Sequence, residues 1–294
     1  MQKIKVSIVI VHYKDKQALF NCLKSIEDNK PKVSFEVIVV DNDETKVIED
    51  ELKSRFNWVV YIKSPSNLGY GAGNNLGAKR AKGEYILFLN PDTQLKPNSV
   101  DNLVLFLDKN KDVAVVAPNL IDAKGKVFSQ LGSRELTPIR GIFALSFLNK
   151  IFPNNPFSRD YYLFDLPMNK KREVDAVPGS AFLIRKKVFV EVGGFDENIF
   201  LFFEESDLGR RIKKAGYKLF IIPDSEIFHF WKGKEKASKK IRKIFKQSRF
   251  YYFKKHFGFL SAILVEIFAR FSKRIFLFFI FFVILVLFLY NLLK

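Results

Sequence analysis

The sequence predicts an α/β fold with a doubly wound, mostly parallel sheet, followed by a C-terminal membrane helix. Short β-branched apolar runs recur through the first 90 residues. They alternate with stretches of helical periodicity, which is the pattern of βαβ units. Residues 275–293 contain no charged side chain. A helix of that length extends about 28 Å, close to the ~30 Å hydrocarbon core of a bilayer.

The predicted elements alternate in order along the chain. In the first helix, Leu19, Leu23 and Ile26 recur at helical spacing. The strands are predicted at 4–11, 35–40, 58–62 and 85–89, and the helices at 15–29, 46–55 and from 66 to 81. In such sheets ligands bind beyond the carboxyl ends of the strands, and Tyr13, Asp41 and Asp92 all fall there.

The charge is concentrated near the C-terminus. The net charge is +18, and residues 232–255 contain eleven Lys or Arg against one acid. Because this segment precedes an uncharged run long enough to span a membrane, we expect it to contact lipid headgroups on the cytoplasmic side of that membrane. We do not expect it to bind nucleic acid. Cys22 is the only cysteine, which excludes a disulfide framework. The predicted regions are a globular domain over 1–231, a basic juxtamembrane segment over 232–256, and a membrane-associated or transmembrane segment over 257–294.

Two polar segments follow predicted strands. Asp41 and Asn42 can reach a nucleobase edge and a ribose hydroxyl, although this pair is also common in N-caps and Asx turns. Small residues in segment 67–75 let a helix start close to a nucleotide, or pack tightly on the sheet. This segment lacks the Lys-Ser/Thr of a P-loop and follows the third strand, so it does not fit a generic dinucleotide motif.

Asn90, Pro91 and Asp92 follow the strand at 85–89. Proline holds the backbone extended where the sheet ends, so Asp92 is expected to project into the crevice. One carboxylate with phosphate oxygens and waters is sufficient for Mg²⁺ or Mn²⁺. The alternative is that Asp92 and Thr93 start the next helix.

Glu204, Glu205 and Asp207 lie together at a predicted helix start. The helix dipole favours carboxylates there, which alone would explain all three. Asp207 and Arg211 have the i,i+4 spacing of a helical ion pair. One of the two glutamates, partly desolvated, is the candidate general base. His229 follows a strand-like run at 219–222, and it is either structural or a ligand of a metal or diphosphate.

The segments discussed above belong to a longer set of short sequence motifs that follow one another in a fixed order along the chain. They are VSIVIVHY (6–13), VDN (40–42), NLGYGAGNN (67–75), LNPDT (89–93), PGSAFLIR (178–185), GGFDE (193–197), FEESDL (203–208) and His229. The ordered set resembles the family 2 inverting glycosyltransferases of the GT-A fold, especially the rhamnosyltransferase-like branch of bacterial surface-polysaccharide synthesis. The resemblance covers roughly residues 5–233.

The resemblance implies a nucleotide-sugar donor and a divalent cation, Mg²⁺ or Mn²⁺. It implies a donor site that contains Tyr13, Asp41, Asn42, Asn67, Gly69, Asn75 and Asn90. Asp92 stands at the metal-binding position, and His229 near the metal and diphosphate. Glu205 stands where the family has its catalytic Asp, with Glu204 as the alternative. The sequence departs from the family in Asn90, which replaces the first Asp of the DxD form, and in the extra methylene of Glu205.

The resemblance therefore implies an inverting, metal-dependent transfer of a sugar such as rhamnose to an acceptor hydroxyl. The membrane helix and its basic flank suggest that the acceptor is a lipid-linked glycan. The expected location is the cytoplasmic face of the plasma or inner membrane. One alternative is a catalytically silent, membrane-tethered module that binds nucleotide sugars. A nucleotidyltransferase would favour glycines in the first strand-helix loop, where this chain has His12-Tyr13-Lys14. The donors dTDP-rhamnose, UDP-hexose and UDP-galactofuranose all fit the sequence.

Overall fold

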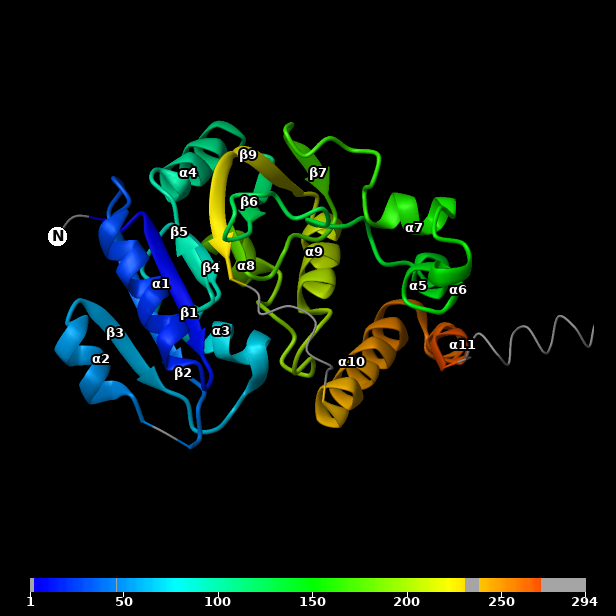
Figure 1. The fold of residues 1–294 in the computed structure, drawn as a ribbon, viewed down its shortest axis with the longest axis horizontal. Coiled ribbons are helices and arrows are strands. Elements are labelled where there is room, and N and C mark those ends of the chain that lie inside the picture. The colour runs from blue at the N-terminus through cyan, green and yellow to red at the C-terminus, as the bar shows by residue number, and fades with distance from the viewer. Residues whose placement is uncertain (1–2, 46, 231–237, 271–294) are drawn as a thin grey trace, which may run out of the picture. The chain divides into compact units, whose positions relative to one another are not determined.

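The computed structural model describes residues 3–45, 47–230 and 238–270 (Figure 1). The chain divides into two compact units. The first contains residues up to 135 together with 162–248, and the second contains 136–161 and the residues from 249 onward. Residues 136–161, which the sequence places inside a domain over 1–231, thus group with the C-terminal part of the chain.

The first unit is built on one mixed sheet. In the described residues the strand order is β3-β2-β1-β4-β8-β6-β9-β5, and β7 pairs with β9. The strands are β1 (Val6–His12), β2 (Phe35–Asp41), β3 (Val59–Lys63), β4 (Tyr85–Leu89), β5 (Thr93–Leu95), β6 (Val113–Ile121), β7 (Arg172–Val174), β8 (Ala181–Arg185) and β9 (Lys218–His229).

The predicted strands at 4–11, 35–40, 58–62 and 85–89 are present as β1 to β4, which are mutually parallel. The sheet is mixed, so the expected α/β fold is present but the mostly parallel pairing only in part: β6 is also parallel to β9, whereas β8 is antiparallel to β4 and β6, and β5 and β7 are antiparallel to β9. The apolar run of β8 is as buried as a central parallel strand, so its composition does not reveal its direction.

Helices connect and cover these strands. Those of the first unit are α1 (Lys16–Asp28), α2 (Glu49–Arg55), α3 (Gly69–Arg80), α4 (Ser99–Lys109), α8 (Lys186–Glu191) and α9 (Glu204–Lys214). The Asp15 carboxylate caps α1 by accepting from the Ala18 amide at 3.0 Å. The alternative prediction that Asp92 and Thr93 start the next helix is wrong. Thr93 pairs with His229 in the sheet, and the next helix begins at Ser99.

The second unit is helical. It contains α5 (Pro138–Ala144), α6 (Leu148–Ile151), α7 (Pro156–Tyr161) and α11 (Phe259–Arg270), and α10 (Lys239–Phe257) runs from the first unit into it. Within the ranges that the structure describes, no helix combines the length and hydropathy needed to span a membrane. The predicted membrane helix at 275–293 lies outside those ranges.

Candidate active site

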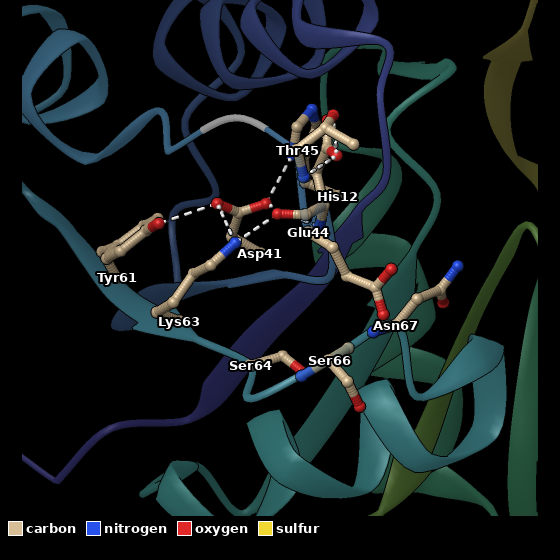
Figure 2. Close-up of polar contacts among 10 residues, drawn as sticks. His12, Asp41, Glu44, Thr45, Tyr61, Lys63, Ser64, Ser66 and Asn67 are labelled. Atoms are coloured by element: carbon tan, nitrogen blue, oxygen red, sulfur yellow. Dashed lines mark hydrogen bonds and ion pairs between the residues drawn. The ribbon is translucent and has the colours of Figure 1, made fainter.

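Asp41, the last residue of β2, is the centre of a buried polar cluster (Figure 2). Its Oδ2 accepts hydrogen bonds from the Tyr61 hydroxyl at 2.7 Å and from Lys63 Nζ at 3.2 Å. Its Oδ1 lies 3.0 Å from both His12 Nδ1 and the Asp43 amide nitrogen. Burial alone would raise the pKa of Asp41, but these bonds, led by His12 and then Tyr61, lower it to about 2. Asp41 is therefore ionised, and both of its oxygens are occupied.

The imidazole of His12 is oriented by this carboxylate. Because Nδ1 faces Asp41, we assign the proton of the neutral ring to Nδ1, which leaves Nε2 as an acceptor. Nε2 is buried, and within the described part of the chain it has no hydrogen-bond partner. His12 and Asp43 line a pocket of about 590 Å³ between the N-terminal ends of α1 and α2. Tyr13 follows as a 42% exposed ring, with Lys14 Nζ 5.1 Å from its centroid.

Asn42, Asn67 and Gly69 hold the start of α3. The side-chain amide of Asn42 donates to the Gly69 carbonyl at 2.9 Å, and the Asn67 side-chain oxygen accepts from the Gly69 amide at 3.0 Å. Gly69 has a φ of +82°, and a Cβ there would overlap the Phe200 carbonyl. The Tyr70 amide donates to that same carbonyl at 3.0 Å. The expected donor-binding segment is thus fixed against the segment that leads to α9.

Asn75 lies one turn further along α3. Its amide nitrogen donates to the Phe195 carbonyl at 2.9 Å and to Glu197 Oε1 at 3.0 Å. Its side-chain oxygen accepts from the Phe195 amide at 2.9 Å. These three bonds use the amide to join α3 to the GGFDE segment, whereas the sequence expectation for Asn75 is donor binding.

The end of β4 holds Asp92 in a tight turn. The Thr93 amide and hydroxyl donate to the Asn90 carbonyl at 3.2 and 2.6 Å. The Asn90 amide donates to the Ser180 carbonyl at 2.8 Å. Asp92 Oδ2 lies 3.4 Å from His229 Nε2, because Thr93 and His229 are directly paired in the sheet. The structure therefore brings together the two residues expected at the metal.

The chemistry of this pair fits a divalent cation. Asp92 Oδ1 is buried, and no described residue gives it a hydrogen bond. The described residues contain no cluster of three His, Cys, Asp or Glu side chains that could hold a metal. A cation at Asp92 and His229 would therefore take its other ligands from phosphate oxygens and water, as Mg²⁺ and Mn²⁺ do at nucleotide sites.

Glu204 and Glu205 begin α9 after an unusual backbone. Phe202 and Phe203 both have a φ of 71°, a left-handed conformation that aromatic residues rarely adopt. The ring centroid of Phe245, on α10, lies 5.3 Å from that of Phe202 and 5.1 Å from that of Phe203. Packing on α10 thus supports the strained turn that places both carboxylates.

The two glutamates have different surroundings. Glu204 is 2% exposed beside Gly71 of α3, and its Oε1 lacks a hydrogen-bond partner among the described residues. Burial, and then the neighbouring charge of Glu205, raise the pKa of Glu204 well above its ordinary value. Burial also raises the pKa of Glu205. Asp207 is buried and pairs with Arg211 at 2.6 and 2.9 Å, which confirms the predicted i,i+4 pair.

Segment 178–180 links the two carboxylate sites. Its Ser180 carbonyl binds the Asn90 amide of the Asp92 turn. Gly179 lies against Glu205 so closely that an added Cβ would overlap the carboxylate. The Tyr70 hydroxyl donates to the Gly179 carbonyl. The turn that contains Asp92 and the side chain of Glu205, which are far apart in sequence, therefore both contact this three-residue segment.

Sequence reasoning missed several residues of the site. Tyr61 and Lys63 end the strand beside β2, on the face of Asp41, so the two-residue alternation of β3 is a signal that could have found them. Tyr70 and Phe245 contribute only through long-range packing, and the sequence gives no local signal for either.

A model of "Glycosyl transferase family 2" matches residues 7–193. The chain belongs to glycosyl transferase family 2. The match includes the Asp41 cluster, the Asp92 turn and segment 178–180, and it ends before Glu204 and His229. The predicted family is therefore confirmed.

Two relatives of this glycosyltransferase are named as rhamnosyltransferases. It is 29% identical over 204 residues to the Mycobacterium tuberculosis N-acetylglucosaminyl-diphospho-decaprenol L-rhamnosyltransferase, covering 66% of each chain. It is 26% identical over 232 residues to rhamnosyltransferase WbbL of Escherichia coli, covering 76% of this chain and 83% of that one. The chain thus spans just under two thirds of the mycobacterial relative.

Solved structures confirm the GT-A fold. GalNAc-T7, crystallised with UDP, GalNAc and Mn²⁺, matches with a TM-score of 0.59 at 18% identity, covering 86% of this chain and 51% of that chain. Staphylococcus aureus TarS 1–349, in complex with UDP-GlcNAc, matches with a TM-score of 0.56 at 15% identity, covering 88% and 69%.

Proposed function

We propose that this glycosyltransferase moves a rhamnosyl residue from a nucleotide-diphosphate donor to a hydroxyl of a lipid-linked glycan, with inversion at the anomeric carbon. The observation that carries the proposal is that the turn holding Asp92 and the side chain of Glu205 both contact segment 178–180. One carboxylate is then available to a metal-bound diphosphate and the other to the attacking hydroxyl. The named activities of two relatives support the rhamnosyl donor, and the mycobacterial relative supports the lipid-linked acceptor.

Glu205 is the proposed general base. In a direct displacement the acceptor hydroxyl attacks the anomeric carbon, and its proton passes to a Glu205 oxygen as the bond to the diphosphate breaks. Glu204 is a poorer base because it is buried beside Gly71, and because burial and the neighbouring Glu205 charge raise its pKa well above the ordinary value. Of the two carboxylates, Glu204 is thus the one that more readily stays protonated, which favours Glu205 as the base.

Asp41 and His12 are the proposed contacts for the nucleoside. Asp41 fixes the ring of His12, and the buried Nε2 acceptor matches an N–H or O–H group of the donor. The pocket lined by His12 and Asp43 has the volume of a small-molecule site.

Asp92 and His229 are the proposed metal ligands. A bound divalent cation would neutralise the charge that grows on the departing nucleoside diphosphate. The unpartnered Asp92 Oδ1 supports this assignment. The 3.4 Å separation of the two side chains is close enough for both to reach one ion.

We also propose that the enzyme is held at the cytoplasmic face of the plasma membrane. The support is the basic composition of 232–256 and the uncharged run at 275–293. Attachment would raise the local concentration of a lipid-linked acceptor.

A transfer assay tests the proposed activity. The detergent-solubilised protein is incubated with a polyprenyl-diphosphate glycan and with dTDP-rhamnose, UDP-hexoses or UDP-galactofuranose in turn, and the anomeric configuration of the product is determined by NMR. We expect transfer from dTDP-rhamnose with inversion. Folded protein that neither transfers nor hydrolyses any donor would indicate a silent binding module. Transfer with retained configuration would contradict the direct displacement.

A further inference from the structure

Helix α11 has two unlike faces. The face packed into the second unit carries Ala262, Val265 and Glu266. The opposite face exposes Leu260, Leu264 and Ile267, which are 76%, 52% and 43% exposed. These three positions are spaced i, i+4 and i+7, so they form one apolar stripe along the helix. A helix at a protein–water boundary normally has the reverse arrangement, with its charged residues outward.

The buried face fixes the rotation of α11. Glu266 accepts hydrogen bonds from Arg249 Nε of α10 at 2.6 Å and from Arg270 Nε at 3.1 Å. The side chains of Arg249 and Glu266 are 5% and 8% exposed, so rotating α11 to hide the stripe would break this buried ion pair. This ion pair therefore keeps the apolar stripe on the exposed face of α11.

The described residues of α11 do not by themselves extend across a bilayer. Twelve residues extend about 18 Å, well short of the ~30 Å hydrocarbon core. They include the charged side chains of Glu266 and Arg270. As far as the structure describes it, α11 has the dimensions of a helix that lies along a membrane surface.

The surroundings of the stripe are basic. Lys254 and Lys255 are exposed in the last turn of α10, and Gly258, with a φ of +87°, turns the chain into α11. After α11 come Lys273 and Arg274 and then the uncharged residues 275–293. An apolar stripe with flanking cations, continuous with a membrane-length apolar run, has the chemistry of an interfacial helix on anionic lipid.

We propose that α11 lies in the plane of the membrane interface, with Leu260, Leu264 and Ile267 inserted among anionic lipids. Lys254 and Lys255 contact the lipid phosphates. The proposal rests on the membrane attachment under Proposed function and is independent of the transferase activity. In the two alternatives to this proposal, either residues 271–294 or a second copy of the chain covers the stripe.

Site-directed spin labelling of the full chain tests the proposal. Burial raises the pKa of the Cys22 thiol to about 12, so native Cys22 stays protonated and unlabelled at pH 7.5. Nitroxide is attached to Leu260→Cys or Leu264→Cys, and to Val190→Cys as the control. Val190 is an equally apolar and exposed residue, on α8 of the first unit. Each protein is reconstituted into nanodiscs that contain anionic phosphatidylglycerol. Accessibility to oxygen, which partitions into lipid, is compared with accessibility to a water-soluble nickel chelate.

We expect labels at 260 and 264 to be accessible to oxygen and shielded from nickel, while the label at 190 is accessible to nickel. Nickel accessibility like that of residue 190 would overturn the proposal. Shielding from both reagents would also overturn it, because protein would then cover the stripe. Protein that fails to enter nanodiscs would refute membrane attachment itself, an outcome distinct from a solvent-exposed label in nanodisc-bound protein.

Discussion

Tyr61→Phe isolates one hydrogen bond of the Asp41 cluster. The substitution removes the hydroxyl that donates to Asp41 Oδ2 at 2.7 Å and keeps the ring. Asp41 is fully buried and ionised, and hydrogen bonds to charged groups contribute about 1.5–3 kcal/mol each. We therefore expect Tyr61→Phe to lower the free energy of unfolding by about 2 kcal/mol at pH 7.

The pH dependence of this loss follows from the pKa of Asp41. The folded pKa is lowered from 3.8 to about 2, so the stabilisation is present above pH 3.8 and is lost as pH falls through 2. The difference between 3.8 and about 2 corresponds to roughly 2.4 kcal/mol. Tyr61→Phe should raise the folded pKa toward 3.8, so the two proteins should approach each other in stability as pH falls toward 2.

Urea unfolding at pH 7, 4 and 2 measures this difference. The matched control is Tyr217→Phe, because the Tyr217 hydroxyl makes only a 3.4 Å contact to Glu191 at the surface. We expect the control to change stability by less than about 0.5 kcal/mol. A Tyr61→Phe protein as stable as the wild type at pH 7, or a loss that does not shrink between pH 4 and pH 2, would refute the reasoning.

Four further substitutions, with one control, test the arrangement of the carboxylates. Glu204→Gln should retain most transfer activity, whereas Glu205→Gln should lose about 10²–10⁴-fold in kcat; the reverse order would exchange their roles. Because the folded pKa of Glu204 is raised, the wild type should lose stability relative to Glu204→Gln as pH rises above 4.5, which unfolding titrations at pH 4.5 and 8 can check. Gly179→Ala should displace the Glu205 carboxylate and cost about 10²-fold in kcat. Gly125→Ala, where an added Cβ meets nothing within 4 Å, should lower stability because the φ of +78° strains an alanine, but it should leave the kcat of the folded protein unchanged. Phe245→Ala should lower kcat more than it raises the donor KM, because it loosens the turn before α9; a pure KM effect would contradict that role.

Much of the fold could be predicted from local patterns. The β-branched runs of β1 to β4 and the polar residues after them locate Asp41 and Asp92 at the edge of the sheet, because parallel strands end on one side. The direction of β8 could not be predicted, since burial on both faces gives parallel and antiparallel strands the same composition.

Side-chain roles were less predictable than positions. Asn75 and Glu205 both stand in motif segments, but only the folded chain shows that the Asn75 amide is occupied by Phe195 and Glu197. The difference between Glu204 and Glu205 depends on Gly71 and Gly179, which are remote in sequence. Phe245 lies in the basic segment over 232–256, for which the sequence predicts only membrane contact. Its packing on Phe202 and Phe203 is a tertiary contact that no local pattern indicates.

The measurement that tests the central claim most directly is metal-dependent thermal stabilisation by the donor, in wild type, Asp92→Asn and Glu205→Gln. A donor at 100 times its Kd stabilises the folded state by about 2.7 kcal/mol. We predict stabilisation by dTDP-rhamnose with Mn²⁺ in the wild type and in Glu205→Gln, and its loss in Asp92→Asn or after chelation. Equal stabilisation of Asp92→Asn, with or without Mn²⁺, would contradict a donor site built on a cation at Asp92.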